Sequence, residues 1–257
     1  MTQIISIANQ KGGVGKTTST INLGVALAHL QRRVLLIDLD PQGALSVGLG
    51  VKPGEPEYTV YEVLMNGAVT INQAIIPVQA NLDLLPADND LAAAEVELIP
   101  EFRREMVLRN ALVPLNDWYD YILIDCPPSL SLLTVNAFTA STGVIVPMQC
   151  EFFSFRVIRT LMESVDRTRD RLNPGLELIG ILPTMYSTGT IHSREVFEQA
   201  RNLYGDKVFD IVIYKSIRFA EASVANKAMI DYSTDHKGAL AYQQLAQTLA
   251  EKLEQRG

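Results

Sequence analysis

The chain has 257 residues, of which 47% are hydrophobic, so it can bury a sizeable core without disulfide support. Its formal net charge is −7, which means that the whole molecule repels nucleic acid and that any DNA contact must use a local basic patch. Cys126 and Cys150 lie in or beside apolar runs and lack metal-site spacing, which favours reduced core cysteines over a disulfide or a metal site.

The first 38 residues have the pattern strand, glycine-rich turn, helix, strand. The apolar run 4–8 predicts a strand, helical spacing of apolar residues predicts a helix over 17–31, and the continuous apolar run 34–38 predicts a buried strand. Such a unit is typical of a parallel sheet with a right-handed crossover. Because the first strand begins close to Met1 and no apolar run approaches 18 residues, we expect no signal peptide and a soluble, cytoplasmic protein.

Residues 44–81 are rich in Gly, Pro and polar residues, which predicts an exposed excursion with one short helix at 60–65. After a short strand at 82–86, Asp90 is a candidate N-cap for a helix over 91–98, and Pro100 separates that helix from another over 101–112.

The remaining sequence alternates between strand and helix patterns. Strands are expected at 121–125, 143–147, 177–182 and 208–213, helices at 131–140, 154–172 and 191–204, and a C-terminal helix at 238–253 that docks on the core through Leu240, Leu245, Leu249 and Leu253. This alternation predicts the α/β class, with a single doubly wound, mostly parallel sheet flanked by helices in one domain over residues 1–257.

The turn after the first strand, QKGGVGKTT at 10–18, predicts a phosphate-binding loop. Backbone N–H groups and the positive end of the helix dipole would surround one anion there. Lys16 is expected to reach the β- and γ-phosphates, and Thr17 to place its hydroxyl on Mg²⁺. The expected nucleotide contacts in the loop are Lys11, Gly12, Gly13, Val14, Gly15, Lys16, Thr17 and Thr18.

The loop departs from the ordinary pattern G-x-x-x-x-G-K-[ST] at its start, where Gln10 replaces the first glycine and Lys11 follows. A lysine at the mouth of the loop points away from its own phosphate site or lies at the rim. We expect Lys11 to serve a nucleotide in a neighbouring subunit, which would make dimerisation part of the mechanism.

Three aspartates lie at the carboxyl ends of predicted strands, where parallel sheets bind ligands. Asp125 matches a Walker-B aspartate that holds Mg²⁺ directly or through its water shell. Asp40 lies in the turn sequence DLDPQG and would orient or polarise the attacking water; the alternative is a turn-forming Asx-Pro pair. Asp38 is expected to support the water ligands of Mg²⁺.

Three motifs in this order and spacing resemble the ParA/Soj/MinD class of deviant Walker ATPases: KGGVGKTT at 11–18, DLDPQG at 38–43 and IDCPPS at 124–129. The resemblance extends over essentially the whole chain and favours the short ParA branch without an N-terminal DNA-reading domain. It implies a P-loop NTPase fold, ATP/ADP and Mg²⁺ as cofactors, weak basal turnover and an ATP-sandwich homodimer in which Lys11 crosses to the partner's phosphates. Within PTMY at 183–186, Pro183 and Thr184 are implied nucleotide contacts, and Asp40 is implied to be needed for hydrolysis.

The resemblance also implies non-specific binding of double-stranded DNA by the ATP dimer, a nucleoid-associated location, and a ParB-like activator that stimulates hydrolysis. Arg218 is the implied DNA contact, with Lys215 and Lys227 beside it. The sequence departs from the family pattern at 187–189 and 214–216, near the expected adenine pocket and DNA face. The cargo, which could be a chromosome, a plasmid or a protein compartment, is left open.

Two other resemblances lead to different functions. In a MinD-like membrane ATPase the last helix would be an anchor, and Gln243, Gln244, Glu251 and Glu254 argue against it. A protein resembling nitrogenase reductase would bridge an iron–sulfur cluster between subunits, which needs exposed cysteines. A nucleotide-binding module without turnover is a further alternative.

Overall fold

The computed structural model describes residues 1–65, 69–151 and 154–254. Its described part contains a seven-stranded sheet in the order β3-β4-β2-β5-β1-β6-β7. Every neighbouring pair is parallel except β3 with β4, which confirms the predicted α/β class with a mostly parallel sheet. The strands are β1 (Gln3–Ile7), β2 (Val34–Asp38), β3 (Ile76–Gln79), β4 (Leu82–Leu85), β5 (Tyr121–Asp125), β6 (Gly143–Gln149) and β7 (Glu177–Thr184).

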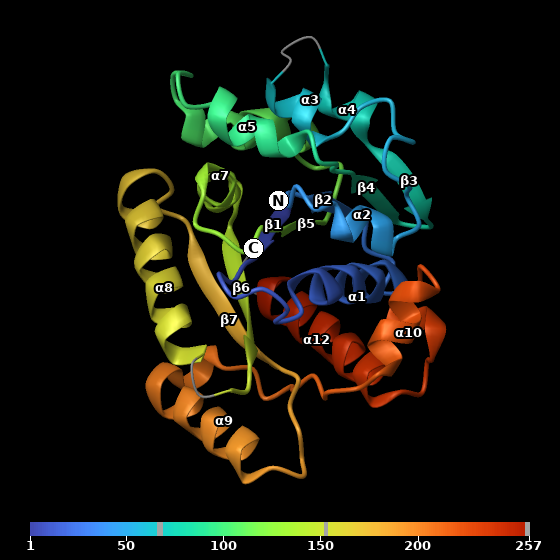
Figure 1. The fold of residues 1–257 in the computed structure, drawn as a ribbon, viewed down its shortest axis with the longest axis vertical. Coiled ribbons are helices and arrows are strands. Elements are labelled where there is room, and N and C mark those ends of the chain that lie inside the picture. Colours follow the sequence, from blue (N-terminus) through green and yellow to red (C-terminus); the bar gives the residue numbers. More distant parts are fainter. Residues whose placement is uncertain (66–68, 152–153, 255–257) are drawn as a thin grey trace.

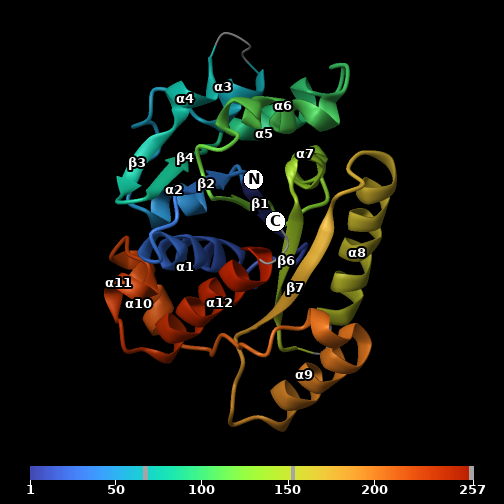
Figure 2. The same cartoon turned by 180° about the vertical axis from the view of Figure 1, so that it is seen from behind.

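Helices cover both faces of the sheet (Figure 1), and the view from behind shows the same two layers (Figure 2). One face carries α1 (Lys16–His29), α2 (Ala44–Gly48), α10 (Arg218–Val224), α11 (Met229–Tyr232) and α12 (Lys237–Glu254). The other carries α3 (Val60–Met65), α4 (Ile71–Ala74), α5 (Leu91–Glu97), α6 (Val107–Leu112), α7 (Leu132–Ala140), α8 (Ser154–Arg171) and α9 (Ile191–Tyr204).

The central strands feed a separate hydrophobic core on each face. In β5, Tyr121 and Leu123 face the core under α1 and α12, whereas Ile122 and Ile124 face the core under α7. This period of two follows from the pleat of a strand, and burial on both faces explains the unbroken apolar runs in the sequence. Gly24 lets α1 approach the sheet closely, because a Cβ there would lie 2.6 Å from Cδ2 of Leu36.

The predicted strand at 208–213 is wrong. Val208 makes an isolated bridge to Ile181, and two backbone hydrogen bonds join this segment to β7: Phe209 N–H donates to Ile181 O, and Ile213 N–H donates to Pro183 O. The segment uses four residues where β7 uses two, so no regular ladder forms. The apolar pattern reflects burial, since Phe209, Ile211 and Ile213 belong to the core beneath α12.

Residues 44–81 contain more structure than the sequence predicts. Besides the expected α3, they form α2, α4 and the edge strand β3, which pairs antiparallel with β4 through a turn containing Asn81 at φ 62°. Pro77 lies in this edge strand, where a missing N–H is tolerated. Such short elements leave little periodicity to detect.

Two details of the next segment also differ from the prediction. Of the helix expected over 101–112, only a 3₁₀ turn (Arg104–Met106) and α6 form. Asp90 makes no side-chain cap to α5, because its own backbone is already helical; instead the Asp88 carboxylate accepts a hydrogen bond from the Asp90 N–H at 3.1 Å.

The C-terminal helix docks on the core as predicted. Leu245, Leu249 and Leu253 are buried against the core that α1 shares, although Leu240 is half exposed. Cys126 and Cys150 are free and buried, which confirms their predicted place in the core. Within the described residues, none of the helices has the length and apolar character needed to cross a membrane.

Candidate nucleotide-binding site

The loop between β1 and α1 is shaped to receive an anion. Gly13 and Gly15 have φ values of 71° and 88°, which strain any residue with a Cβ. A Cβ added at Gly12 or Gly13 would meet no atom within 4 Å, so the backbone there borders open space. Because α1 begins at Lys16, the free N–H groups and the positive dipole end of a 14-residue helix face the loop.

Two buried polar side chains hold this loop in place. The Asn9 amide donates to Pro147 O at 2.6 Å on β6, and its oxygen accepts from the Lys11 N–H at 2.9 Å. The Thr184 hydroxyl donates to Val14 O at 2.8 Å from the end of β7. Thr184, predicted to contact the nucleotide, thus holds the phosphate loop in place. Pro183, the other residue predicted there, accepts a hydrogen bond from the Ile213 N–H through its carbonyl. Sequence reasoning missed Asn9, whose one signal is a polar residue directly after a buried strand.

Asp125 lies at the bottom of the site, where β5 ends between β1 and β2. Its side chain is fully buried and accepts a hydrogen bond from the Thr17 hydroxyl at 2.6 Å. Burial and the neighbouring charge of Asp38 raise its pKa to about 8. A buried carboxylate of this kind favours a cation, and adjacent oxygen ligands of octahedral Mg²⁺ lie about 2.9 Å apart. Thr17 and Asp125 therefore fit one magnesium ion.

Lys16 contributes the opposite charge. Its side chain is 7% exposed, and burial lowers its pKa against the attraction of Asp125 and Asp40. Among the described residues, no cluster of three or more His, Cys, Asp or Glu side chains could form a complete metal cage. A magnesium ion at Thr17 and Asp125 would complete its shell with phosphate oxygens and water, as Mg²⁺ commonly does.

Asp38 pairs in register with Asp125 across β2 and β5, but its oxygens are already engaged. One oxygen accepts from Ser46 N–H at 2.8 Å and from the Ser46 hydroxyl at 2.7 Å, so Asp38 fastens α2 to the sheet. Burial raises its pKa to about 6. This arrangement suits contact through water better than direct ligation. Nothing in the sequence pattern singles out Ser46.

Asp40 lies in a turn that its own side chain helps to form. Its carboxylate accepts from Gln42 N–H at 3.0 Å, and its carbonyl accepts from Gly43 N–H at 2.9 Å. The Asx-turn alternative is thus present. The turn keeps the half-buried Asp40 near Lys16, and the negative charge of Asp40 acts to raise the pKa of Lys16.

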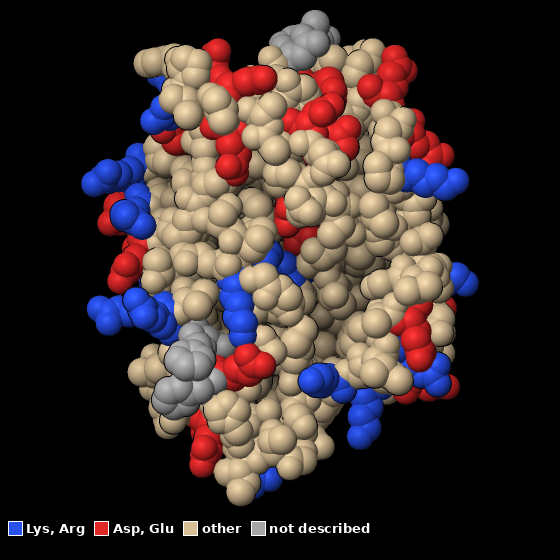
Figure 3. Space-filling view, viewed as in Figure 1, with Lys and Arg blue, Asp and Glu red and all other residues tan. Residues whose placement is uncertain are grey.

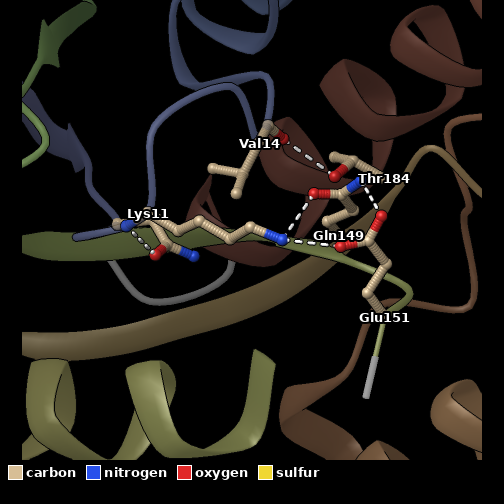
Figure 4. Close-up of polar contacts among 6 residues, drawn as sticks. Lys11, Val14, Gln149, Glu151 and Thr184 are labelled. Atoms are coloured by element: carbon tan, nitrogen blue, oxygen red, sulfur yellow. Dashed lines mark hydrogen bonds and ion pairs between the residues drawn. The ribbon is translucent and has the colours of Figure 1, made fainter. Parts of the chain in front are cut away.

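Lys11 has a different environment from Lys16. Its ammonium group donates to the Gln149 side-chain oxygen at 2.9 Å and to the Glu151 carboxylate at 2.7 Å (Figure 4). The side chain thus extends to the end of β6 and is 34% exposed. Within this chain, Lys11 lies at the rim of the site and Lys16 in its interior.

Comparisons with known proteins agree with this geometry. A family model described as an AAA domain matches residues 2–178. The chain is 47% identical over 246 residues to the chromosome partitioning protein ParA of Caulobacter vibrioides, with 95% of this chain and 92% of that protein covered. It is 43% identical over 250 residues to the sporulation initiation inhibitor protein Soj of Bacillus subtilis, with 97% and 99% covered. The chain belongs to the ParA family of P-loop ATPases.

A solved structure of the same fold carries a nucleotide. The protein called cobyrinic acid a,c-diamide synthase from Mycobacterium smegmatis, with bound ADP and magnesium, has a TM-score of 0.88 and 38% identity, and the match covers 99% of this chain and 96% of that one. A structural neighbour of this chain is thus known with ADP and magnesium bound.

In this ParA-family chain, a mostly apolar cavity of about 200 Å³ lies beside the phosphate loop. It is lined by Gly15, Thr18, Thr184 and residues of the segment after β7, among them Tyr214, Lys215 and Phe219. The Tyr214 ring is fixed by edge contacts with Tyr186 and lies under the Lys237 ammonium at 5.8 Å. The position next to the loop suits a nucleotide base. Lys215, predicted to contact DNA, is therefore also a wall of this cavity.

The other two predicted DNA residues lie further along the same segment. Arg218 begins α10, and its guanidinium is paired with Glu221 at 3.0 Å. Lys227 is exposed after α10. In the space-filling view, acidic side chains gather over α3 and α5 at the top, whereas basic and acidic side chains lie together along α8 and on the lower half (Figure 3). The charge of this ParA-family chain is thus unevenly distributed despite its net value of −7.

Proposed function

We propose that this chain is a Mg²⁺-dependent ATPase that acts as a dimerisation switch in the positioning of a chromosome, a plasmid or another cargo. The observation that carries the proposal is the cluster of buried Lys16 and Asp125 with the partly buried Thr17 beneath an open glycine loop, because it fits a nucleotide phosphate and a magnesium ion together. The ParA and Soj relatives support the assignment to partitioning.

In the proposed mechanism the chain mainly supplies position and charge. The loop N–H groups and Lys16 bind the β- and γ-phosphates, and the cavity near Tyr214 holds the base. Thr17 and Asp125 would hold Mg²⁺, which would neutralise negative charge on the phosphates. Asp40 orients the attacking water from its turn beside the site, and Asp38 supports the magnesium shell through water.

The dimer is the second part of the proposal. Lys11 at the rim extends from one subunit to the phosphates of its partner, so two bound ATP molecules hold two chains face to face. Because each lysine contacts a nucleotide only in the dimer, ATP has a higher affinity for that state and shifts the population toward it. A ParB-like activator then stimulates hydrolysis and returns the chains to monomers.

The DNA-binding part of the proposal uses Arg218, Lys215 and Lys227 on the segment 214–227. A single copy of this patch is weak, since Arg218 shares its charge with Glu221. Dimerisation doubles the patch and steepens both affinity and salt dependence. This would place the ATP dimer on the nucleoid in the cytoplasm without sequence preference.

A MinD-like membrane role is the less favoured alternative. The apolar residues of α12 that an anchor would present to lipid are mostly buried against the core. Co-sedimentation with anionic liposomes in the presence of ATP should therefore leave the protein in the supernatant.

The variant Asp40→Ala tests the proposal most simply. It should bind ATP normally, hydrolyse it at least about tenfold more slowly, and accumulate as a dimer, because the loop and Lys11 are intact while water positioning is lost. Phosphate release and light scattering after gel filtration measure the two effects. Asp88→Ala, which removes another turn aspartate outside the site, is the matched control. Unchanged turnover in Asp40→Ala would remove Asp40 from the mechanism.

A further inference from the structure

The partners of Lys11 form a closed polar triangle at the end of β6 (Figure 4). The lysine ammonium donates to Gln149 Oε1 at 2.9 Å and to Glu151 Oε2 at 2.7 Å. The Gln149 amide donates in turn to Glu151 Oε1 at 2.6 Å. Each of the three side chains thus contacts the other two, and both carboxylate oxygens of Glu151 are engaged.

The triangle is attached to the rigid part of the site. Gln149 is the last residue of β6, and the next residue donates its N–H to Thr184 O at 3.2 Å. Thr184 holds the loop at Val14, and Asn9 holds the backbone of Lys11 to β6. Both ends of the lysine side chain are therefore fastened to the same strand. The contact is built into the sheet edge and does not depend on a long flexible segment.

These contacts compete with the role proposed for Lys11. An ammonium group has three donors, and two of them are engaged within the chain. The Glu151 carboxylate also neutralises the charge that would attract a partner's phosphate. We propose that Gln149 and Glu151 are positioning residues that latch Lys11 inside its own subunit, so that each chain must release this latch before it can complete a partner's nucleotide site. This inference rests on the proposed ATP dimer.

The latch is weak enough to be released. The side chains of Lys11 and Glu151 are 34% and 51% exposed. Exposed ion pairs of this kind favour the paired over the unpaired state by a factor of about two to five. A symmetric dimer breaks one latch in each subunit, so the factors multiply. Removing both latches should therefore lower the dimer dissociation constant by roughly four- to 25-fold. The latch would set the ATP concentration at which the switch responds.

Two variants of Glu151 weaken the latch to different degrees. Glu151→Gln removes the charge but keeps an oxygen that can accept from Lys11, whereas Glu151→Ala removes both. Glu163→Gln is the matched control, because Glu163 forms an exposed ion pair with Arg159 on α8 at 3.4 Å and the variant changes net charge by the same amount.

The latch is first measured in the nucleotide-free chain, as the acylation rate of Lys11 with acetic anhydride followed by peptide mass spectrometry. Glu151→Ala should raise this rate about two- to fivefold, Glu151→Gln should raise it less, and Glu163→Gln should leave it unchanged. Equal rates in all four proteins would overturn the latch.

Its consequence is then measured by analytical ultracentrifugation with Mg²⁺ and a non-hydrolysable ATP analogue. The dimer dissociation constant should fall in the order wild type, Glu151→Gln, Glu151→Ala, with Glu163→Gln equal to wild type. If all four proteins dimerise with one constant, the latch proposal fails while the dimer proposal stands. If the nucleotide dimerises none of them, the proposed dimer fails and the latch inference fails with it.

Discussion

The two lysines of the phosphate loop lie five positions apart and have opposite environments. Lys16 is buried near Asp125, at the end of β5, and Asp40, in the turn that follows β2. Lys11 is partly exposed and is held by Glu151, which lies beyond the carboxyl end of β6. The interior lysine is fixed by the fold itself, whereas the rim lysine can exchange its partners for those of another chain. In the proposed dimer, one loop would thus bind a nucleotide through Lys16 and contact the nucleotide of a second subunit through Lys11.

The largest effect is expected at the interior lysine. Lys16→Ala removes a buried cation and its charge-assisted hydrogen bonds to phosphate, so ATP affinity should fall on the order of 100-fold or more. Isothermal titration calorimetry with Mg²⁺-ATP measures it. Lys52→Ala, at an exposed lysine outside the site, is the control and should bind as wild type. If Lys16→Ala kept normal affinity, the difference between the two lysines would lose its basis.

The next effect concerns the carboxylate beneath Lys16. Asp125 faces Asp38 on β2, Lys16 and Thr17 on α1, and Asp40 in its turn. Its pKa is raised to about 8, whereas the unfolded chain has a value of about 3.9. Between these values the folded chain keeps a proton that the unfolded chain has released, so stability falls as the pH rises through that window.

Asp125→Asn should therefore have opposite effects on stability and binding. At pH 8 the ligand-free variant should melt about 2–6 °C higher than wild type, with a flatter pH profile, because a buried charge is gone. The further rise in Tm that wild type gains from Mg²⁺ and ATP should be largely lost. Thermal melts with and without ligand measure both, with Asp170→Asn at an exposed position of α8 as control. A lower ligand-free Tm at pH 8 would contradict the account of the buried carboxylates.

The fold around Lys16 could be predicted because its parts carry local signals. The glycines of the loop, the apolar runs of β1, β2 and β5, and the aspartates that follow them are all visible in the sequence. The partners that set the details could not be predicted. Ser46 binds Asp38, and Glu151 binds Lys11, only because the sheet brings together segments that are far apart or weakly patterned.

In the segment after β7, the sequence predicts a strand that the structure does not form. Its apolar residues at 208–213 have the alternation of a strand, but burial under α12 produces the same pattern without a ladder. The apolar cavity beside the phosphate loop, which this segment lines with Tyr214 and Lys215, has no motif of its own. A pattern of hydrophobicity thus predicts burial more securely than it predicts pairing.

The smallest effect is expected at a surface cation that resembles Lys11 in its exposure. Arg218→Glu would replace the proposed phosphate contact with a negative charge next to Glu221, so DNA affinity of the ATP dimer should fall about five- to tenfold at low salt. A gel shift with random-sequence duplex measures it, and basal ATPase activity should not change. Arg33→Glu, at the other end of the sheet, controls for net charge. Retained DNA binding would move the DNA face away from α10.

The dimer and the rim lysine are tested most directly by comparing wild type with Lys11→Ala. Sedimentation equilibrium with Mg²⁺ and a non-hydrolysable ATP analogue gives the mass of each. Wild type should sediment as a dimer with the nucleotide and as a monomer without it, and Lys11→Ala should stay monomeric although calorimetry shows that it still binds the nucleotide. A Lys11→Ala protein that dimerises as tightly as wild type would contradict the assignment of the rim lysine to a partner subunit.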